Sequence, residues 1–535
     1  MPTETSPLLS SHCENGTCPA DGAVQQSSER KGPNPDVARS VWWTMPALAI
    51  GIFLSAADQT LVVASYGKIG NEFAALNQTS WIATAYFLTL TAFQPLYGRI
   101  SDLFGRKAAL CFSFGLFAVG CLWCGLARSM KELIIARAFT GIGGGGMTTV
   151  VAILLSDVVP LRDRGTWQGY NNIVYASGAG LGAPLGGALA DTLGWRWSFL
   201  LQVPVSILAF LNVLFVLRER PLDHHWRKNI KQVDFLGALL LVTAIATLFL
   251  GLDGGSNDSW GDPMAYGNVV ASIVFFGLFL FNEAKTTCQP FAPLQIVFSR
   301  PILACLLCNF FAFGTYIALT YNLPLYWQAV ESLSATAAGV RLLPGILANV
   351  CGSLFAGWIM RRTCRYRWLT ICCYLMFLIG TVPVILFTGL VGASIWGIWV
   401  GMVVYGFGNG IGGTSTLVAL IANAVPEDQA VGIACLYLFR SLGSGIGVSI
   451  SATVIQALLK TYLFERLHGI GDAEEIARKV RESLSYIDEL SDAALREAVR
   501  MCYGWAVQAS FWLMAVFVCG ALLGAILIRE AKLGE

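Results

Sequence analysis

Long apolar segments separated by short polar loops fill this chain from residue 43 to residue 528. A transmembrane helix needs about 20 mostly apolar residues to cross the hydrocarbon core of the bilayer. Fourteen segments meet this requirement, at residues 43–66, 80–98, 107–127, 133–156, 167–190, 196–217, 234–252, 266–283, 302–327, 336–360, 367–388, 395–422, 431–459 and 505–528. The pattern therefore predicts an all-α membrane protein with fourteen transmembrane helices.

Two polar stretches flank or interrupt this pattern. Residues 1–42 lack a basic-then-apolar leader, so we expect a disordered tail and membrane insertion by the first apolar helix. Residues 460–504 are rich in Ala, Glu and Arg, which predicts surface helices. A solvated cap is the favoured interpretation of this insertion, and a binding domain is the alternative.

Basic residues are distributed unequally between the two sides of the membrane. With the amino terminus inside, the inside tails and loops hold 21 Lys and Arg, whereas the short outside loops hold four. This bias predicts that both termini are cytoplasmic, since positive residues are retained on that side. Two sequons, at Asn77 and Asn257, then fall in outside loops and are candidate glycosylation sites.

Composition narrows the chemistry further. Only 13% of the residues are charged, against about 25% in soluble domains, and the net charge of +2 gives no reason to expect a nucleic acid partner. All four histidines lie outside the predicted spans, so we expect no metal or haem site there. We also find no phosphate-binding loop and no nucleophile and base cluster within the spans. We therefore expect no cofactor, no ATP hydrolysis and no enzyme activity.

A charged loop at residues 98–107 holds three cations and one carboxylate between two apolar segments. Gly98 and Gly105 allow close helix approach, and Asp102 can accept hydrogen bonds from backbone N–H groups or from arginine. Residues 357–365 repeat the pattern weakly after the tenth span. Duplicated halves around a central site are typical of transporters.

The repeat sets the expected domain boundaries. We predict a cytoplasmic tail at residues 1–42, a six-helix bundle at 43–218, a cytoplasmic linker at 219–233, an inserted helix pair with its linker at 234–301, a second six-helix bundle at 302–528 that includes the outside loop 460–504, and a cytoplasmic tail at 529–535.

Three motifs give the chain a resemblance to a known family. Residues 98–107 match its loop motif, residues 137–143 match its fourth-span motif, and residues 178–187 resemble its fifth-span motif, with the proline one position later than usual. On these motifs the chain resembles the major facilitator superfamily, in the fourteen-span drug:proton antiporter branch. The resemblance implies proton-driven transport by two six-helix halves and an inserted helix pair.

Two further signals concern substrate and location. Residues 58–70 are similar to fungal vacuolar basic amino acid transporters. Glu4, Leu8 and Leu9 form an acidic dileucine pattern that resembles vacuolar sorting signals and implies a sorting adaptor as partner. We expect a multi-pass vacuolar membrane protein that exchanges protons for basic amino acids. A plasma-membrane exporter of drugs or toxins is the alternative, and a non-transporting nutrient sensor is a third hypothesis.

The candidate proton-coupling residues are Asp58 and Arg137. Asp58 is the one carboxylate well inside a predicted span, where a charge costs roughly 2.5–3.5 kcal/mol on insertion scales. At 1.5 Å per residue, Asp58 lies about 12 Å and Arg137 about 6 Å below the outside face, within reach of one arginine side chain. The resemblance implies that both spans line the central cavity and links Arg137 to proton coupling. Asp58 then either carries the proton or binds the substrate cation, and a fold-stabilising ion pair is the structural alternative.

The candidate substrate contacts are polar groups inside other spans. Arg440 lies deep in the thirteenth span, where it meets either a substrate carboxylate or backbone carbonyls. Asn172 and Tyr175 share one face of the fifth span, and Tyr326 lies in the ninth. Hydrogen bonding between helices is the alternative role for these three.

The candidate conformational gate combines the charged loop with a glycine stripe. Gly98, Asp102, Gly105 and Arg106 form the loop part. The stripe in the fifth span contributes three further residues, Gly182, Pro184 and Gly186. We expect the glycines to permit close helix contact and the loop to latch the outward-facing state.

Overall fold

The computed structural model describes residues 35–62, 69, 72–73, 80–219, 234–257, 261–285, 294–333, 335–390, 394–425, 428–466, 476, 479–480, 487 and 492–531. Every regular element in these ranges is a helix, which confirms the all-α expectation. The dileucine residues Glu4, Leu8 and Leu9 and the sequon residue Asn77 lie outside these ranges, and the side chain of Asn257 is likewise not described.

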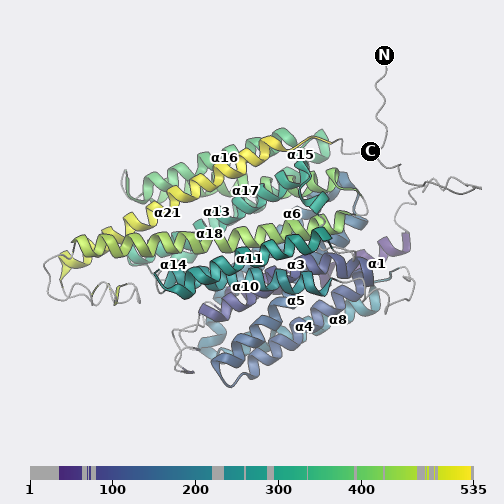
Figure 1. Cartoon of the computed structure of the whole chain (residues 1–535), viewed down its shortest axis with the longest axis horizontal. Coiled ribbons are helices and arrows are strands. Elements are labelled where there is room, and N and C mark those ends of the chain that lie inside the picture. The colour runs from purple at the N-terminus through teal and green to yellow at the C-terminus, as the bar shows by residue number, and fades with distance from the viewer. Residues whose placement is uncertain are drawn as a thin grey trace, which may run out of the picture.

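The helices follow the predicted order of two halves with an inserted pair (Figure 1). The N-terminal half contains α1 (Pro35–Leu61), α3 (Ser80–Phe104), α4 (Arg106–Leu126), α5 (Met130–Val158), α6 (Leu161–Thr192), α7 (Arg196–Leu200) and α8 (Gln202–Val216). The inserted pair is α10 (Phe235–Asn257) and α11 (Pro263–Lys285). The C-terminal half contains α12 (Leu294–Val297), α13 (Arg300–Glu331), α14 (Ala335–Val340), α15 (Leu343–Thr363), α16 (Arg367–Ile385), the π-helical η3 (Leu386–Leu390), α17 (Ile395–Asn423), α18 (Gln429–Arg466) and α21 (Ala493–Leu527).

Each predicted span coincides with one or two of these helices. Eleven spans in the described ranges are long and apolar enough to cross a membrane by length and composition alone. The predicted spans in α1, α3 and α10 do not meet this length and composition requirement. In α1 and α3, buried polar residues such as Asp58 and Gln94 lower the mean hydropathy. Helix also continues past the predicted spans around residues 460–504, because α18 runs to Arg466 and α21 begins at Ala493.

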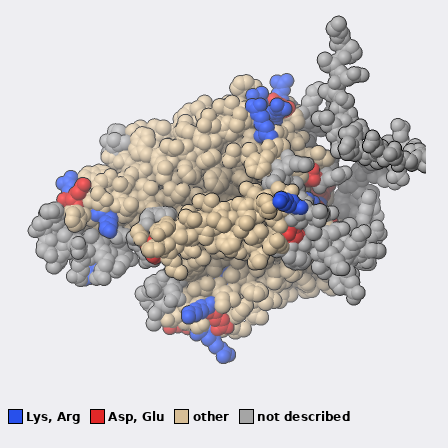
Figure 2. Space-filling view, in the orientation of Figure 1, with Lys and Arg blue, Asp and Glu red and all other residues tan. Residues whose placement is uncertain are grey.

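The outer surface fits a membrane setting. On the face drawn in Figure 2, the described charged residues gather near the helix ends and leave a broad uncharged area between them. Large apolar side chains on the surface, such as Phe215, Trp368 and Trp396, are more than two-thirds exposed. Such a surface is stable against lipid and not against water.

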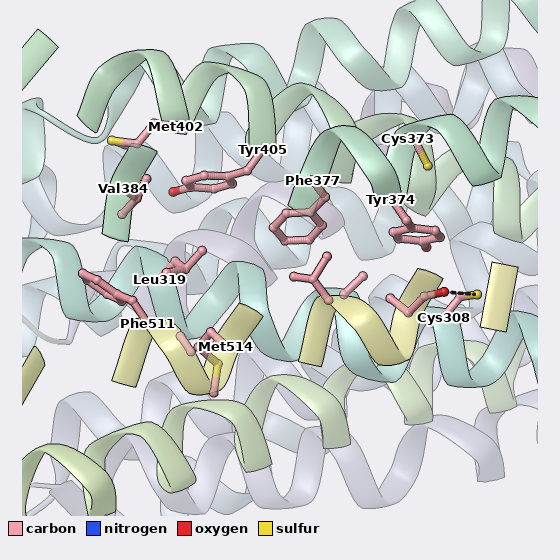
Figure 3. Close-up of a cluster of buried hydrophobic side chains, with 14 of the residues drawn as sticks. Cys308, Leu319, Cys373, Tyr374, Phe377, Val384, Met402, Tyr405, Phe511 and Met514 are labelled. Atoms are coloured by element: carbon pink, nitrogen blue, oxygen red, sulfur yellow. Dashed lines mark hydrogen bonds between the residues drawn. The ribbon is translucent and has the colours of Figure 1, made fainter. Parts of the chain in front are cut away.

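Each half has its own apolar core. The larger core fills the C-terminal half and joins α13, α16, α17 and α21 (Figure 3). Within it the rings of Phe377 and Tyr405 stack with their centroids 5.8 Å apart. The inserted pair packs on α3 and α18, one helix from each half, through Leu241, Phe249 and Leu438.

Two glycines with positive φ mark opposite ends of the bundle. Gly105, between α3 and α4, has φ of 92°, and Gly194, between α6 and α7, has φ of 98°. A side chain at either position would be strained, so glycine permits these sharp connections. We call these two ends of the bundle the Gly105 end and the Gly194 end.

The two halves meet closely along two helix pairs at the Gly105 end. A Cβ atom on Gly98 of α3 would lie 2.7 Å from the Cβ atom of Ala434 on α18. A Cβ atom on Gly357 of α15 would lie 2.5 Å from the backbone nitrogen of Thr166 on α6. Side chains extend the contact inward, since the Ser441 hydroxyl donates to Gln94 Oε1 at 2.9 Å. This end is therefore closed between the halves.

Glycines also set the helix spacing inside the N-terminal half, which yields a stability prediction. A Cβ atom on Gly143 of α5 would lie 2.6 Å from the backbone nitrogen of Phe117 on α4, whereas one on Gly115 of α4 would meet nothing within 4 Å. Overpacking costs about 1–3 kcal/mol, so Gly143→Ala should lower the apparent unfolding temperature in detergent by about 5 °C. Gly115→Ala is the matched control and should not lower it. Equal midpoints for the two variants would contradict this packing.

Candidate functional site

The structure brings Asp58 of α1 and Arg137 of α5 together in the N-terminal half. Arg137 Nη1 donates to Asp58 Oδ2 at 2.5 Å. Asp58 is 0% exposed and Arg137 is 1% exposed. A pair of opposite charges this deeply buried is stable only if hydrogen bonds satisfy its remaining polar atoms.

Neighbouring elements supply those hydrogen bonds. Arg137 Nε donates to the carbonyl of Ile82 at 3.1 Å. Gln202 Nε2, at the start of α8, donates to Asp58 Oδ1 at 3.1 Å, so both carboxylate oxygens accept a hydrogen bond. The Arg137 guanidinium also lies 4.5 Å from the ring centroid of Tyr86 and 5.5 Å from that of Phe199, which adds cation–π attraction.

Sequence reasoning missed Gln202, although a signal was present. Gln202 is a polar residue at the start of a very apolar helix. The short helix α7 places Phe199 over the guanidinium, and the turn into α8 places Gln202 beside the carboxylate. A buried amide in an apolar span has the same need for a partner as a buried charge.

Glycines in α5 give a further polar group room beside the pair. The Tyr86 hydroxyl donates to the carbonyl of Ser55 at 3.1 Å, one turn before Asp58. A Cβ atom on Gly144 would lie 2.3 Å from that hydroxyl oxygen. Glycine at this position therefore permits Tyr86 to reach α1 and cover the ion pair.

The predicted substrate residues separate into two groups. Asn172 faces the C-terminal half, because its Nδ2 donates to Ser353 Oγ of α15 at 2.7 Å. The Tyr175 hydroxyl instead donates to Gln59 Oε1 of α1, in its own half, at 3.0 Å. Tyr175 is 37% exposed in mid-helix. Tyr326, in contrast, is 2% exposed inside the C-terminal core and does not line the seam between the halves.

Arg440 lies at that seam on α18. Its Nη2 donates to Asn309 Oδ1 at 3.1 Å and to the carbonyl of Gly413 at 3.4 Å. Its guanidinium lies 4.0 Å from the ring centroid of Phe313 and 5.0 Å from that of Tyr437. No carboxylate in the described part of the chain pairs with Arg440, and its buried Nε has no hydrogen-bond partner there.

The charged loop forms a network at the Gly105 end. Arg106 joins two carboxylates, donating to Asp102 Oδ1 at 2.7 Å and to Asp157 Oδ2 at 2.9 Å. Glu219, which sequence reasoning missed, accepts from the backbone nitrogens of Arg106 at 2.8 Å and Lys107 at 3.0 Å. A carboxylate at this position satisfies the first N–H groups of α4 and complements its dipole.

The glycine stripe of α6 packs against α1 inside the same half. Cβ atoms on Gly182 and Gly186 would lie 2.5 Å and 2.2 Å from the carbonyl oxygens of Ala57 and Leu61. The side chain of Pro184 is not described. The stripe therefore sets the distance between α6 and α1, the helix that carries Asp58, and is not a contact between halves.

A second cluster stabilises the Gly194 end of the N-terminal half. Glu72 accepts from Trp195 Nε1 at 2.6 Å and from Arg196 Nη1 at 2.6 Å. Partial burial raises the pKa of Glu72, but these hydrogen bonds and the charge of Arg196 outweigh it, so the pKa is lower than usual. The Glu72 carboxyl group therefore ionises more readily than an isolated glutamate.

These features define the class of protein. One helical bundle holds a buried ion pair and the other holds a deep arginine, and buried charges of this kind are typical of membrane transporters. The chain belongs to the Major Facilitator Superfamily, whose family model matches residues 48–448. The solved structure of the proton:xylose symporter XylE has the same fold, with a TM-score of 0.57 and 15% identity over 90% of this chain and 95% of that chain. The expected fold and family are confirmed.

Curated relatives cover most of the chain. The Schizosaccharomyces pombe "Multidrug resistance protein fnx1" is 38% identical over 91% of this chain and 92% of its own. The "Vacuolar membrane amino acid uptake transporter fnx2" of the same organism is 38% identical over 90% and 84%. The Saccharomyces cerevisiae "Vacuolar basic amino acid transporter 2" is 35% identical over 77% and 90%. The resemblance to vacuolar and drug-transporting members of the family is confirmed.

The buried pair yields a thermodynamic prediction. Removing one partner leaves an uncompensated buried charge, at a cost of about 3–5 kcal/mol. Asp58→Asn and Arg137→Gln should each destabilise the purified protein by that amount, and the double variant should recover most of the loss. The coupling energy is measured from the unfolding free energies of wild type, the two single variants and the double variant in the same detergent.

A matched control comes from Arg341 and Glu331, an ion pair that is only partly buried. Its coupling energy should be below about 1 kcal/mol. The pairing would be contradicted if the destabilisations of Asp58→Asn and Arg137→Gln simply added up in the double variant.

Proposed function

We propose that this chain is a proton-coupled antiporter that moves basic amino acids from the cytosol into the vacuole lumen. The observation that carries the proposal is the sequestered pair of Asp58 and Arg137 in a family member related to vacuolar amino acid transporters. The substrate class is supported by the relatives' names, and the coupling is supported by the geometry of the pair.

Protonation of Asp58 would change the charge balance of the N-terminal half. The proton would remove the counter-charge of Arg137 and leave a buried cation, which is strongly unfavourable. Relief requires that Arg137 regain solvent or another partner, and therefore that the half rearrange. A proton on this one carboxylate is in this way tied to conformation, which is the requirement for coupled transport.

The geometry favours the proton over the substrate cation as the ligand of Asp58. Both carboxylate oxygens are already hydrogen-bonded, to Arg137 and Gln202, and the side chain is fully buried. Substrate would instead bind at the seam between the halves, where Asn172 contacts Ser353 and where Arg440 precedes Ser441, which contacts Gln94 of the other half. Arg440 would receive the α-carboxylate of the amino acid.

Orientation follows from the basic residues. We assign the Gly105 end to the cytosol, because the loops at this end carry most of the Lys and Arg. The closed seam at that end then corresponds to a lumen-facing state, which Gly98, Asp102, Gly105 and Arg106 would steady. A proton leaving an acidic lumen supplies about 1.36 kcal/mol per pH unit, and 100 mV adds about 2.3 kcal/mol per charge.

A plasma-membrane exporter of drugs driven by proton antiport is the second candidate. It is favoured by the 38% identity to a protein named for multidrug resistance. The dileucine pattern at Glu4, Leu8 and Leu9 supports the vacuolar assignment instead. Localisation of the tagged protein separates the two candidates.

Transport by isolated vesicles tests the proposed role of Asp58. In vacuolar vesicles energised with ATP, wild-type protein should take up labelled arginine and lysine, and a protonophore should abolish the uptake. Asp58→Asn should reach the membrane and lose at least about 90% of this uptake, since no group would carry the proton. Asp262→Asn is the matched control, because Asp262 is an exposed carboxylate before α11, and it should transport normally. Normal uptake by Asp58→Asn would contradict the proposed role of Asp58 in proton coupling.

A further inference from the structure

A cavity of about 390 Å³ opens at the Gly105 end, away from Asp58 and Arg440. It lies where the start of α1, the start of α6 and the end of α15 meet, so both halves contribute to its wall. Its size falls in the range of small-molecule sites, about 300–1,000 Å³. Neither Asp58 and Arg137 nor Arg440 lines this cavity.

Aromatic rings form much of the wall. The rings of Trp42 and Trp167 meet edge to face with centroids 4.9 Å apart, and those of Trp167 and Tyr170 with centroids 5.4 Å apart. Trp42 and Tyr170 are about half exposed, so the rings are accessible from solvent or from the membrane interface. Clustered aromatic faces carry negative potential and attract organic cations.

The cavity also contains an ion pair that joins the two halves. Arg361 Nε of α15 lies 2.9 Å from Asp163 Oδ1 of α6. The Arg361 side chain is 60% exposed and the Asp163 side chain 34% exposed, although Asp163 Oδ1 itself is buried. Immediately behind it, α6 and α15 are in backbone contact at Gly165 and Gly357.

We propose that this cavity binds an organic ammonium or guanidinium group, which competes with Arg361 for the Asp163 carboxylate and thereby loosens the closed end. Trp42, Trp167 and Tyr170 would hold the cation by their ring faces, and Asp163 would supply the opposite charge. The entering cation would also repel the guanidinium of Arg361, so binding and separation of the halves favour each other. An anion bound to Arg361 is the less favoured ligand, because the three ring faces would not attract it.

The cation has two sources, a cytosolic basic amino acid and the amine headgroup of a lipid. The first source rests on the proposed function and would make the site a cytosolic entry point at which substrate promotes opening. The second source would make the membrane itself regulate the same contact. The recognition chemistry is shared, and the arms of one experiment separate the sources.

Hydrogen exchange of the whole protein in lipid nanodiscs tests the proposal. The reporter is amide exchange in residues 353–363 of α15, which the closed contact protects. One arm uses phosphatidylglycerol discs and adds agmatine, which has the guanidinium of arginine and no carboxylate for Arg440. The other arm adds no amine and replaces half of the lipid by phosphatidylethanolamine.

Exchange at this segment should rise at least about threefold in one arm, and that arm identifies the source. Trp167→Leu should abolish the rise. Trp43→Leu should retain it, because Trp43 is an exposed tryptophan next to Trp42 on α1 that does not line the cavity. Asp163→Asn should exchange fast without any cation. If Trp167→Leu fails a thermal-unfolding check, Trp42→Leu takes its place.

The proposal is overturned if neither arm raises exchange, if the tryptophan variant of the cavity responds like wild type, or if Asp163→Asn exchanges as slowly as wild type. Because agmatine binding needs no flux, these outcomes are independent of the vesicle measurement. Normal arginine uptake without an exchange response would remove this site and leave the proposed function standing.

Discussion

The structure of the N-terminal half depends on one buried ion pair. Asp58 and Arg137 cannot be desolvated separately, so α1 and α5 must lie at a distance set by one guanidinium and one carboxylate. Other features around the pair serve this requirement. Glycines in α5 admit Tyr86, the break between α7 and α8 presents Phe199 and Gln202, and the α6 stripe holds α1 in place.

The contacts that close the Gly105 end are of a different kind. They consist of glycine contacts, a few side-chain hydrogen bonds and a half-exposed ion pair. Exposed ion pairs contribute about 0–1 kcal/mol, so this end can open at low cost. In the proposed mechanism, a strong, sequestered interaction inside one half and weak interactions between the halves would together let a proton change the conformation without unfolding either bundle.

Much of this arrangement could be predicted from the sequence, because membrane spans are local features of hydropathy. All fourteen segments coincide with helices, and span depth together with the family motifs indicated that Asp58 and Arg137 could meet. The face that a side chain presents is decided by tertiary packing. Tyr326 therefore proved to be core, and Gln202 and Glu219, whose partners lie more than 100 residues away, were missed.

Proton release on substrate binding measures the central claim most directly. In weakly buffered detergent solution at the pH of an acidic vacuole, arginine added to wild-type protein should release protons, detected by a pH-sensitive dye. The account predicts that Asp58→Asn binds arginine but releases no protons, because Asp58 is the group that loses a proton when substrate binds. Equal proton release by Asp58→Asn and wild type would contradict the account.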